Sequence, residues 1–384
     1  MSVILALALT SSPPRFTDHQ LQSPDFYSRL ARRTAMLKIA DGTVGLQTAQ
    51  ALCLLAFFDI ISKSHARGRG YGLPCINPAN IAGSFRSAGL TVGLAQSVCQ
   101  CYILGSSTST SSKEVEEHSR LFWSLSLLDL HYGSPILIPS LSEGVHCPRY
   151  ATIESKLTSL PCVPLPQESE SSGVQYLPNV WSNSIRIGTL WSDARNYVSK
   201  CIQGLNELPW RPNSDYVKLC SQLLDFEGTH PTALTYNAVR FAERDRQEIR
   251  DHRDQWLPWL RGQMTYHAIH CVLNHPFLYS IKVFQRAKGT NTFWRSSSEK
   301  ALRHCTWISR LIRLARDKGL ESNDPFLVQA AGIAGSLHLY WTHTSDDQLR
   351  DAALMNLRIC QEFIGEMALH WPVSKATVRV ITAI

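Results

Sequence analysis

The chain has 384 residues, of which 44% are hydrophobic and 18% are charged, with a formal net charge of +7. This composition excludes an intrinsically disordered chain, because it provides enough apolar surface to bury a large core. The positive charge would suit a nucleic acid, but the five arginines between residues 240 and 254 alternate with five acidic residues. Such a mixture is typical of a solvated helix face. Arg29, Arg32 and Arg33 form a small basic group. We interpret them as surface residues that contribute to solubility.

The 11 cysteines are scattered and include no C-x-x-C pair, and the chain has no N-x-[ST] sequence. Both features predict reduced thiols in an intracellular protein. Residues 1–12 contain a short apolar run without the basic stretch that precedes a signal-peptide core. We favour a buried first helix whose upstream part is missing over a signal peptide. Residues 51–61 are too short to span a membrane and contain Asp59.

Most of the chain has apolar residues at helical spacing, and no segment alternates with the period of a strand. We therefore predict an all-α fold, a large multi-helix domain at residues 25–370. It comprises two helical halves, at about 25–132 and 180–370, joined by a proline-rich irregular loop at 133–179. Residues 1–24 form an N-terminal segment, expected to be truncated, and residues 371–384 form a C-terminal tail. The expected helices lie at 25–39, 43–62, 112–132, 180–206, 213–227, 231–250, 255–275, 298–318, 324–343 and 345–369.

The helix expected at 112–132 has the clearest start and stop signals. Ser111 and Glu114 have capping-box spacing, and Gly133 followed by Pro135 is typical of a helix end. Its apolar face, widened by Trp123, predicts burial on most sides. That face contains Leu121, Phe122, Leu125, Leu128 and Tyr132.

The helix expected at 298–318 has similar signals. Ser296 and Glu299 have capping-box spacing, and Gly319 is placed to end the helix. A buried stripe is predicted opposite a row of arginines. The stripe contains Cys305, Ile308, Ile312 and Ala315.

Residues 120–129, RLFWSLSLLD, resemble the central signature of the fungal-specific transcription factor domain. This domain is the regulatory middle homology region of zinc-binuclear-cluster transcription factors. The signature residues, to which the resemblance gives a structural role, are Arg120, Phe122, Trp123, Leu128 and Asp129. Residues 48–56, 188–191, 209–210, 216–227 and 269–278 are similar to other segments of the domain. The combination of these segments is specific to the domain.

The resemblance implies a regulatory body that acts in the nucleus and modulates transcription by RNA polymerase II. Such regulators often control metabolic or secondary-metabolite gene clusters, and some sense a small-molecule effector. The family's DNA-binding module holds two zinc ions with six cysteines, including two C-x-x-C pairs, an arrangement that this chain lacks. We therefore expect no cofactor and no membrane, and contact with DNA only indirectly or through a missing module. The expected partner is the transcription machinery or another regulator, whether the chain is a complete regulator or a fragment.

Residues 68–89 interrupt a place where the family has a helix, a short turn and a second helix. Residues 73–85 look inserted. They are either a true loop or an error in the gene model.

A cluster of potential metal ligands lies within 267–275. His267, His270, Cys271 and His275 would project from one side of a helix. Ligand directions diverge along a helix face, so at most two of them could share one ion. We interpret these residues as structural.

Asp346, Asp347 and Asp351 resemble the aspartate-rich magnesium sites of all-α isoprenoid synthases. The second metal-binding motif of those enzymes is missing, so we favour a helix capped by Thr344 or Ser345, with the acids near its positive end. No G-x-S-x-G, Walker A or H-E-x-x-H motif occurs. The chain is predicted not to be an enzyme. The alternatives are an all-α metal-dependent enzyme and an interaction module that does not bind DNA.

Overall fold

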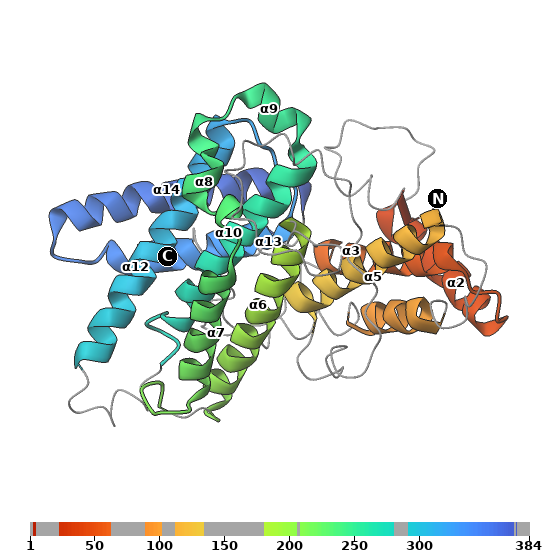
Figure 1. Cartoon of the computed structure of the whole chain (residues 1–384), viewed down its shortest axis with the longest axis horizontal. Helices are drawn as coiled ribbons and strands as arrows, with labels where there is room; N and C mark the ends of the chain where they lie inside the picture. The colour runs from red at the N-terminus through yellow and green to blue at the C-terminus, as the bar shows by residue number, and fades with distance from the viewer. Residues whose placement is uncertain are drawn as a thin grey trace, which may run out of the picture. The chain divides into compact units, whose positions relative to one another are not determined.

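The computed structural model describes residues 3–4, 23–62, 89–101, 112–133, 180–205, 208–279, 291–371 and 374. Every regular element within these ranges is helical, so the predicted all-α class is confirmed (Figure 1). The chain divides into two compact units. Unit 1 comprises Met1–Ala151, Asn323–Ser336 and Cys360–Ile384, and unit 2 comprises Thr152–Ser322 and Leu337–Ile359. Two of the four boundaries between the units fall inside helices, one in α13 (Pro325–Trp341) and one in α14 (Asp347–His370).

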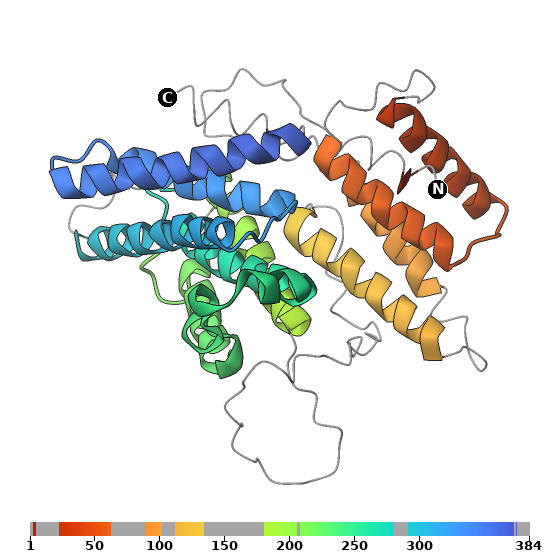
Figure 2. The same cartoon turned by 90° about the horizontal axis from the view of Figure 1, so that it is seen from above.

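Unit 1 contains α2 (Pro24–Ala40), α3 (Leu46–Ser62), a helical segment at 89–101 and α5 (Ser112–Tyr132). Helix α3 packs against α2 and α5, and Figure 2 shows α3 and α5 running side by side. Burial of apolar side chains from these helices is the main stabilising contribution. The core includes Leu52, Leu55, Ala95, Val98, Leu121, Phe122 and Leu125.

Unit 2 contains α6 (Val180–Gln203), α7 (Asp215–Thr229), α10 (Arg253–Leu273) and α12 (Asn291–Asp317). Helix α10 packs against both α6 and α12, and α6 also packs against α7. This explains why buried residues occur all round α10, including Trp256, Trp259, Met264 and Cys271. The amphipathic α12 instead buries one stripe, and the predicted residues Cys305, Ile308, Ile312 and Ala315 are all buried.

The single helix predicted at 231–250 is wrong. The structure has four short helices there: η2 (Thr232–Leu234), α8 (Tyr236–Val239), η3 (Phe241–Glu243) and α9 (Arg246–Asp251). Arg240 adopts a left-handed conformation with φ 48°, which ends α8, and Asp245 caps α9 by accepting from the backbone of Gln247. Tertiary contacts favour the break, because the Trp259 indole donates to the carbonyl oxygen of Leu234 at 2.8 Å.

Helix α12 begins at Asn291, seven residues before the predicted start. Ser296 and Glu299 therefore lie inside the helix, and the predicted capping box is wrong; Glu299 instead pairs with Arg295 at 3.1 Å. The predicted helix end at Gly319 is confirmed, since Gly319 has φ +68° and its neighbour Leu320 donates back to Ala315. The remaining helices agree with the predicted bounds to within three residues. The helical segment at 89–101 was not predicted.

Several predictions lie outside the described residues. These are the loop at 134–179, the insertion at 73–85, the capping role of Ser111, and most of the segments at 1–24 and 371–384. The division into halves at about 25–132 and 180–370 stays a prediction. Among the helices described, none has the length and apolar character required to cross a membrane.

Candidate functional site

The signature residues lie on α5, where burial follows the helical period. Phe122 is 4% exposed, and its ring meets that of Trp123 edge to face with centroids 5.0 Å apart. Trp123 and Leu128 are half-buried and pack against the core of unit 1. Arg120 is exposed and pairs with Glu116 one turn earlier. The apolar members therefore anchor α5, while Arg120 faces solvent.

The C-terminal end of α5 depends on a close approach between Asp129 and Gly133. The Gly133 amide donates to the carbonyl oxygen of Asp129 at 2.6 Å, and a Cβ atom at position 133 would overlap the Asp129 carboxylate. Gly133 is not among the residues with positive φ. The glycine is therefore required for space rather than for a left-handed backbone.

The potential metal ligands of α10 do not form one group. His267 contacts His304 of α12, with their Nδ1 atoms 2.8 Å apart, and the His270 ring stacks on His304 at a centroid distance of 4.0 Å. Cys271 and His275 are fully buried elsewhere in the packing. His304, which was not predicted, is thus the residue that joins the two histidines of α10. We call His267, His270 and His304 the histidine cluster.

Burial keeps the histidine cluster neutral. It lowers the pKa of His267 to about 3 and that of His270 to about 4. The pKa of His304 is also lowered, by burial first and then by the neighbouring histidines and Arg303. In the 2.8 Å contact one Nδ1 atom donates and the other accepts, so the accepting ring is uncharged.

Metal binding has no support within the described ranges. They contain no group of three or more His, Cys, Asp or Glu side chains placed to hold an ion. None of the described cysteines forms a disulfide. These residues do not fit the zinc cluster implied by the sequence resemblance, which needs six cysteines around two ions.

The aspartates at the start of α14 have structural roles. The Asp346 carboxylate accepts from the backbone amide of Leu349 at 3.1 Å, and Asp347 pairs with Arg350 at 2.6 Å. Asp346 is therefore the helix cap, which corrects the prediction of Thr344 or Ser345; Thr344 supports it by accepting from the Asp346 amide at 3.5 Å.

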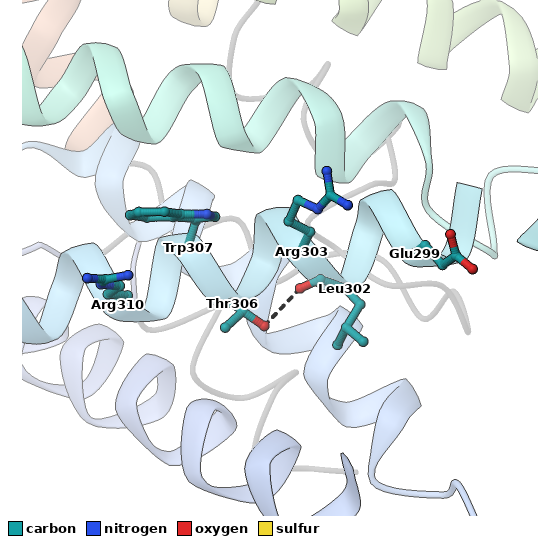
Figure 3. A pocket seen from close by; sticks show the side chains of 6 residues that line it. All are labelled: Glu299, Leu302, Arg303, Thr306, Trp307 and Arg310. Atoms are coloured by element: carbon teal, nitrogen blue, oxygen red, sulfur yellow. Dashed lines mark hydrogen bonds between the residues drawn. The ribbon is translucent and has the colours of Figure 1, made fainter. Parts of the chain in front are cut away.

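An open pocket of about 360 Å³ lies along α12 in unit 2 (Figure 3). All its lining residues belong to this helix, and we call it the α12 groove. Trp307 and Leu302 are half-buried, whereas the charged members are exposed. The residues are Glu299, Leu302, Arg303, Thr306, Trp307 and Arg310.

Trp307 connects the α12 groove to the histidine cluster. Its ring lies parallel to that of His267, with an interplanar angle of 5° and a centroid distance of 5.6 Å. The Arg310 guanidinium lies 4.7 Å from the Trp307 ring centroid and 5.3 Å from that of Tyr236. These cation–π contacts hold Arg310 at the edge of the groove.

No family model and no solved structure matches the chain. Among curated proteins it is similar to the Zn(2)-C6 fungal-type transcription factor FTF1c of Fusarium oxysporum f. sp. lycopersici, with 21% identity over 217 residues. That match covers 55% of this chain and 22% of the relative. FTF2 of the same organism is 22% identical over 192 residues, which cover 49% of this chain and 17% of the relative. The chain is thus similar to Zn(2)-C6 fungal-type transcription factors over about half its length, and the match spans less than a quarter of theirs.

Proposed function

We propose that the chain is a transcription regulator that acts in the nucleus through its helical body. The observation that carries this proposal is the similarity to fungal transcription factors over 217 residues. The proposed process is transcription by RNA polymerase II, and the targets implied by the resemblance are genes of a metabolic or secondary-metabolite cluster. DNA would be reached through a partner regulator or a separate DNA-binding module.

The signature residues of α5 are proposed to maintain the regulatory body rather than to contact a ligand. Phe122 and the neighbouring Leu125 are buried in the core of unit 1, which supports this role. Regulation would then require two packings of the helical body, with a small-molecule effector or a protein partner binding one of them more tightly.

A tethering experiment tests the proposal. The full chain is fused to an unrelated DNA-binding module whose site lies upstream of a reporter gene, in one version with weak basal transcription and in another with strong basal transcription. We expect the fusion to change reporter transcription at least about threefold relative to the DNA-binding module alone, on one of the two reporters.

The matched control is Leu125→Asp, which places a charge in the core of unit 1 and should abolish the effect by unfolding that unit. A fusion that is nuclear and abundant but leaves both reporters unchanged would refute a regulatory role.

A further inference from the structure

The exposed face of α12 carries an excess of unpaired positive charge. Within the described part of the chain, no ion pair involves Lys300, Arg303, Arg310 or Arg313, although all four side chains are exposed. The arginine nearest the start of the helix differs, because Arg295 pairs with Glu299. Arginines elsewhere in unit 2 also have carboxylate partners, as in Arg244 with Glu248 and Arg350 with Asp347. The positive charge of α12 is therefore available to an acidic partner.

The α12 groove adds apolar surface to this charge. Leu302 and Trp307 are half-buried along it, and the Thr306 hydroxyl donates to the carbonyl oxygen of Leu302 at 2.8 Å (Figure 3). The Thr306 hydroxyl is thus satisfied within the helix and leaves its methyl group to the groove. Arg303 and Arg310 lie about one turn before and one turn after Thr306 on the same face.

We propose that the α12 groove binds an acidic peptide segment of another protein, with apolar side chains of that segment against Leu302 and Trp307. Carboxylates of the segment would pair with Arg303 and Arg310. Paired charges at the rim with apolar contacts between them are the pattern by which an amphipathic segment docks into a groove.

A small molecule is a poorer occupant of this groove. Small-molecule sites bury most of the ligand surface between several elements, whereas this groove is lined by residues of one helix. An extended segment can use an open groove because it distributes its contacts along the helix.

A nucleic acid is also less suited to it. Bases of single strands bind by stacking on aromatic rings, but the Trp307 ring already contacts His267 and the Arg310 guanidinium. Apolar contact with Leu302 adds nothing to the binding of a phosphate backbone, which is held by charge.

Fluorescence anisotropy of the full chain tests the proposal. The probe is a short fluorescein-labelled peptide in which Asp and Glu alternate with Leu and Phe. A second peptide replaces Leu and Phe by Ser at the same charge, and the third probe is a labelled DNA duplex. We expect the first peptide to bind most tightly, and the double variant Arg303→Glu with Arg310→Glu to raise its Kd at least about tenfold.

Two further variants separate the groove from charge in general. Thr306→Glu adds a negative charge to the groove at an exposed position and should raise the Kd of the first peptide by a similar factor. This variant tests the groove even if the double variant fails to fold. Arg358→Glu reverses an exposed arginine of α14 and should change the Kd less than about twofold. The proposal is overturned if the peptide does not bind, if Thr306→Glu and Arg358→Glu have equal effects, or if the duplex binds more tightly than the peptide.

Discussion

The Arg32 guanidinium donates to both carboxylate oxygens of Asp59, with one nitrogen at 2.9 and 2.8 Å from them. Arg32 lies on α2 and Asp59 on α3, and Thr91 of the segment at 89–101 joins them through its hydroxyl. Asp59 is 3% exposed. This pair therefore connects three helical segments of unit 1 at a buried position.

Removing one partner of this pair should destabilise unit 1 strongly. Asp59→Ala leaves the Arg32 charge without its carboxylate, and we expect it to lower the free energy of unfolding by about 3 kcal/mol. Urea denaturation followed by circular dichroism measures the change. Arg33→Ala, one residue along at an exposed position, is the matched control and should cost less than about 0.5 kcal/mol. Equal effects of the two variants would contradict the role of the Arg32–Asp59 pair.

The two aromatic residues of the α5 signature should differ in their contribution to stability. Phe122→Ala removes a buried ring and should cost about 3–5 kcal/mol. Trp123→Ala should cost less, about 1–3 kcal/mol, because part of the indole remains in solvent. Differential scanning calorimetry of both variants gives the order of the two losses of stability. Ser124→Ala, at an exposed position, is the control. A larger loss at Trp123 than at Phe122 would be inconsistent with the packing of α5.

The space at the end of α5 predicts opposite effects for two glycine substitutions. Gly133→Ala should destabilise by about 1–3 kcal/mol, because its Cβ overlaps the Asp129 carboxylate. Gly365→Ala, inside α14 with open space around the added Cβ, should stabilise by about 0.5–1 kcal/mol. Thermal unfolding of the two variants tests the signs, and a stabilised Gly133→Ala would show that the close approach is absent.

The histidine cluster should make the protein sensitive to acid. The pKa of His267 and His270 is lowered to about 3 and about 4 by burial, so below the ordinary value of about 6.5 the unfolded state binds protons that the folded state does not. Stability is therefore fully present above about pH 6.5 and falls toward pH 4, by up to about 1.4 kcal/mol per pH unit for each histidine.

Urea midpoints measured at several pH values between 7.5 and 5 report this slope. His304→Phe removes one titrating ring and should reduce the slope, whereas His252→Gln, at a half-buried position outside the cluster, should leave it nearly unchanged. A wild-type protein whose stability is flat over this range would contradict the assignment of neutral, buried histidines.

The helices and their buried faces could be predicted from the sequence where local signals agree with the tertiary packing. The stripe from Cys305 to Ala315 and the end at Gly319 are examples. Prediction failed where tertiary contacts decide the backbone. The residues from 231 to 250 have helical composition. However, Arg240 adopts positive φ, and the carbonyl oxygen of Leu234 accepts a hydrogen bond from the Trp259 indole. Local spacing contains no signal for either feature.

The site residues show the same division. The spacing of His267 and His270 places them on one helix face, but His304, which contacts both, lies 37 residues after His267. Arg32 and Asp59 are likewise 27 residues apart. Such pairs depend on how two helices meet, and a single sequence does not specify this. The positive charge along α12 could be predicted from the sequence, which places arginines opposite the buried stripe. The lack of acidic partners for these arginines could not.

Rapid depletion of the protein in its own cells, followed by sequencing of nascent transcripts, tests the regulatory role most directly. The chain carries a degradation tag, and transcripts are collected before secondary effects develop. Two further strains also carry an untagged copy of the chain, which is wild-type in one and Phe122→Ala in the other. We expect a defined set of transcripts to change promptly, the wild-type copy to restore it, and the core variant to fail to restore it. An unchanged nascent transcriptome after complete loss of the protein would contradict the proposal that it regulates transcription.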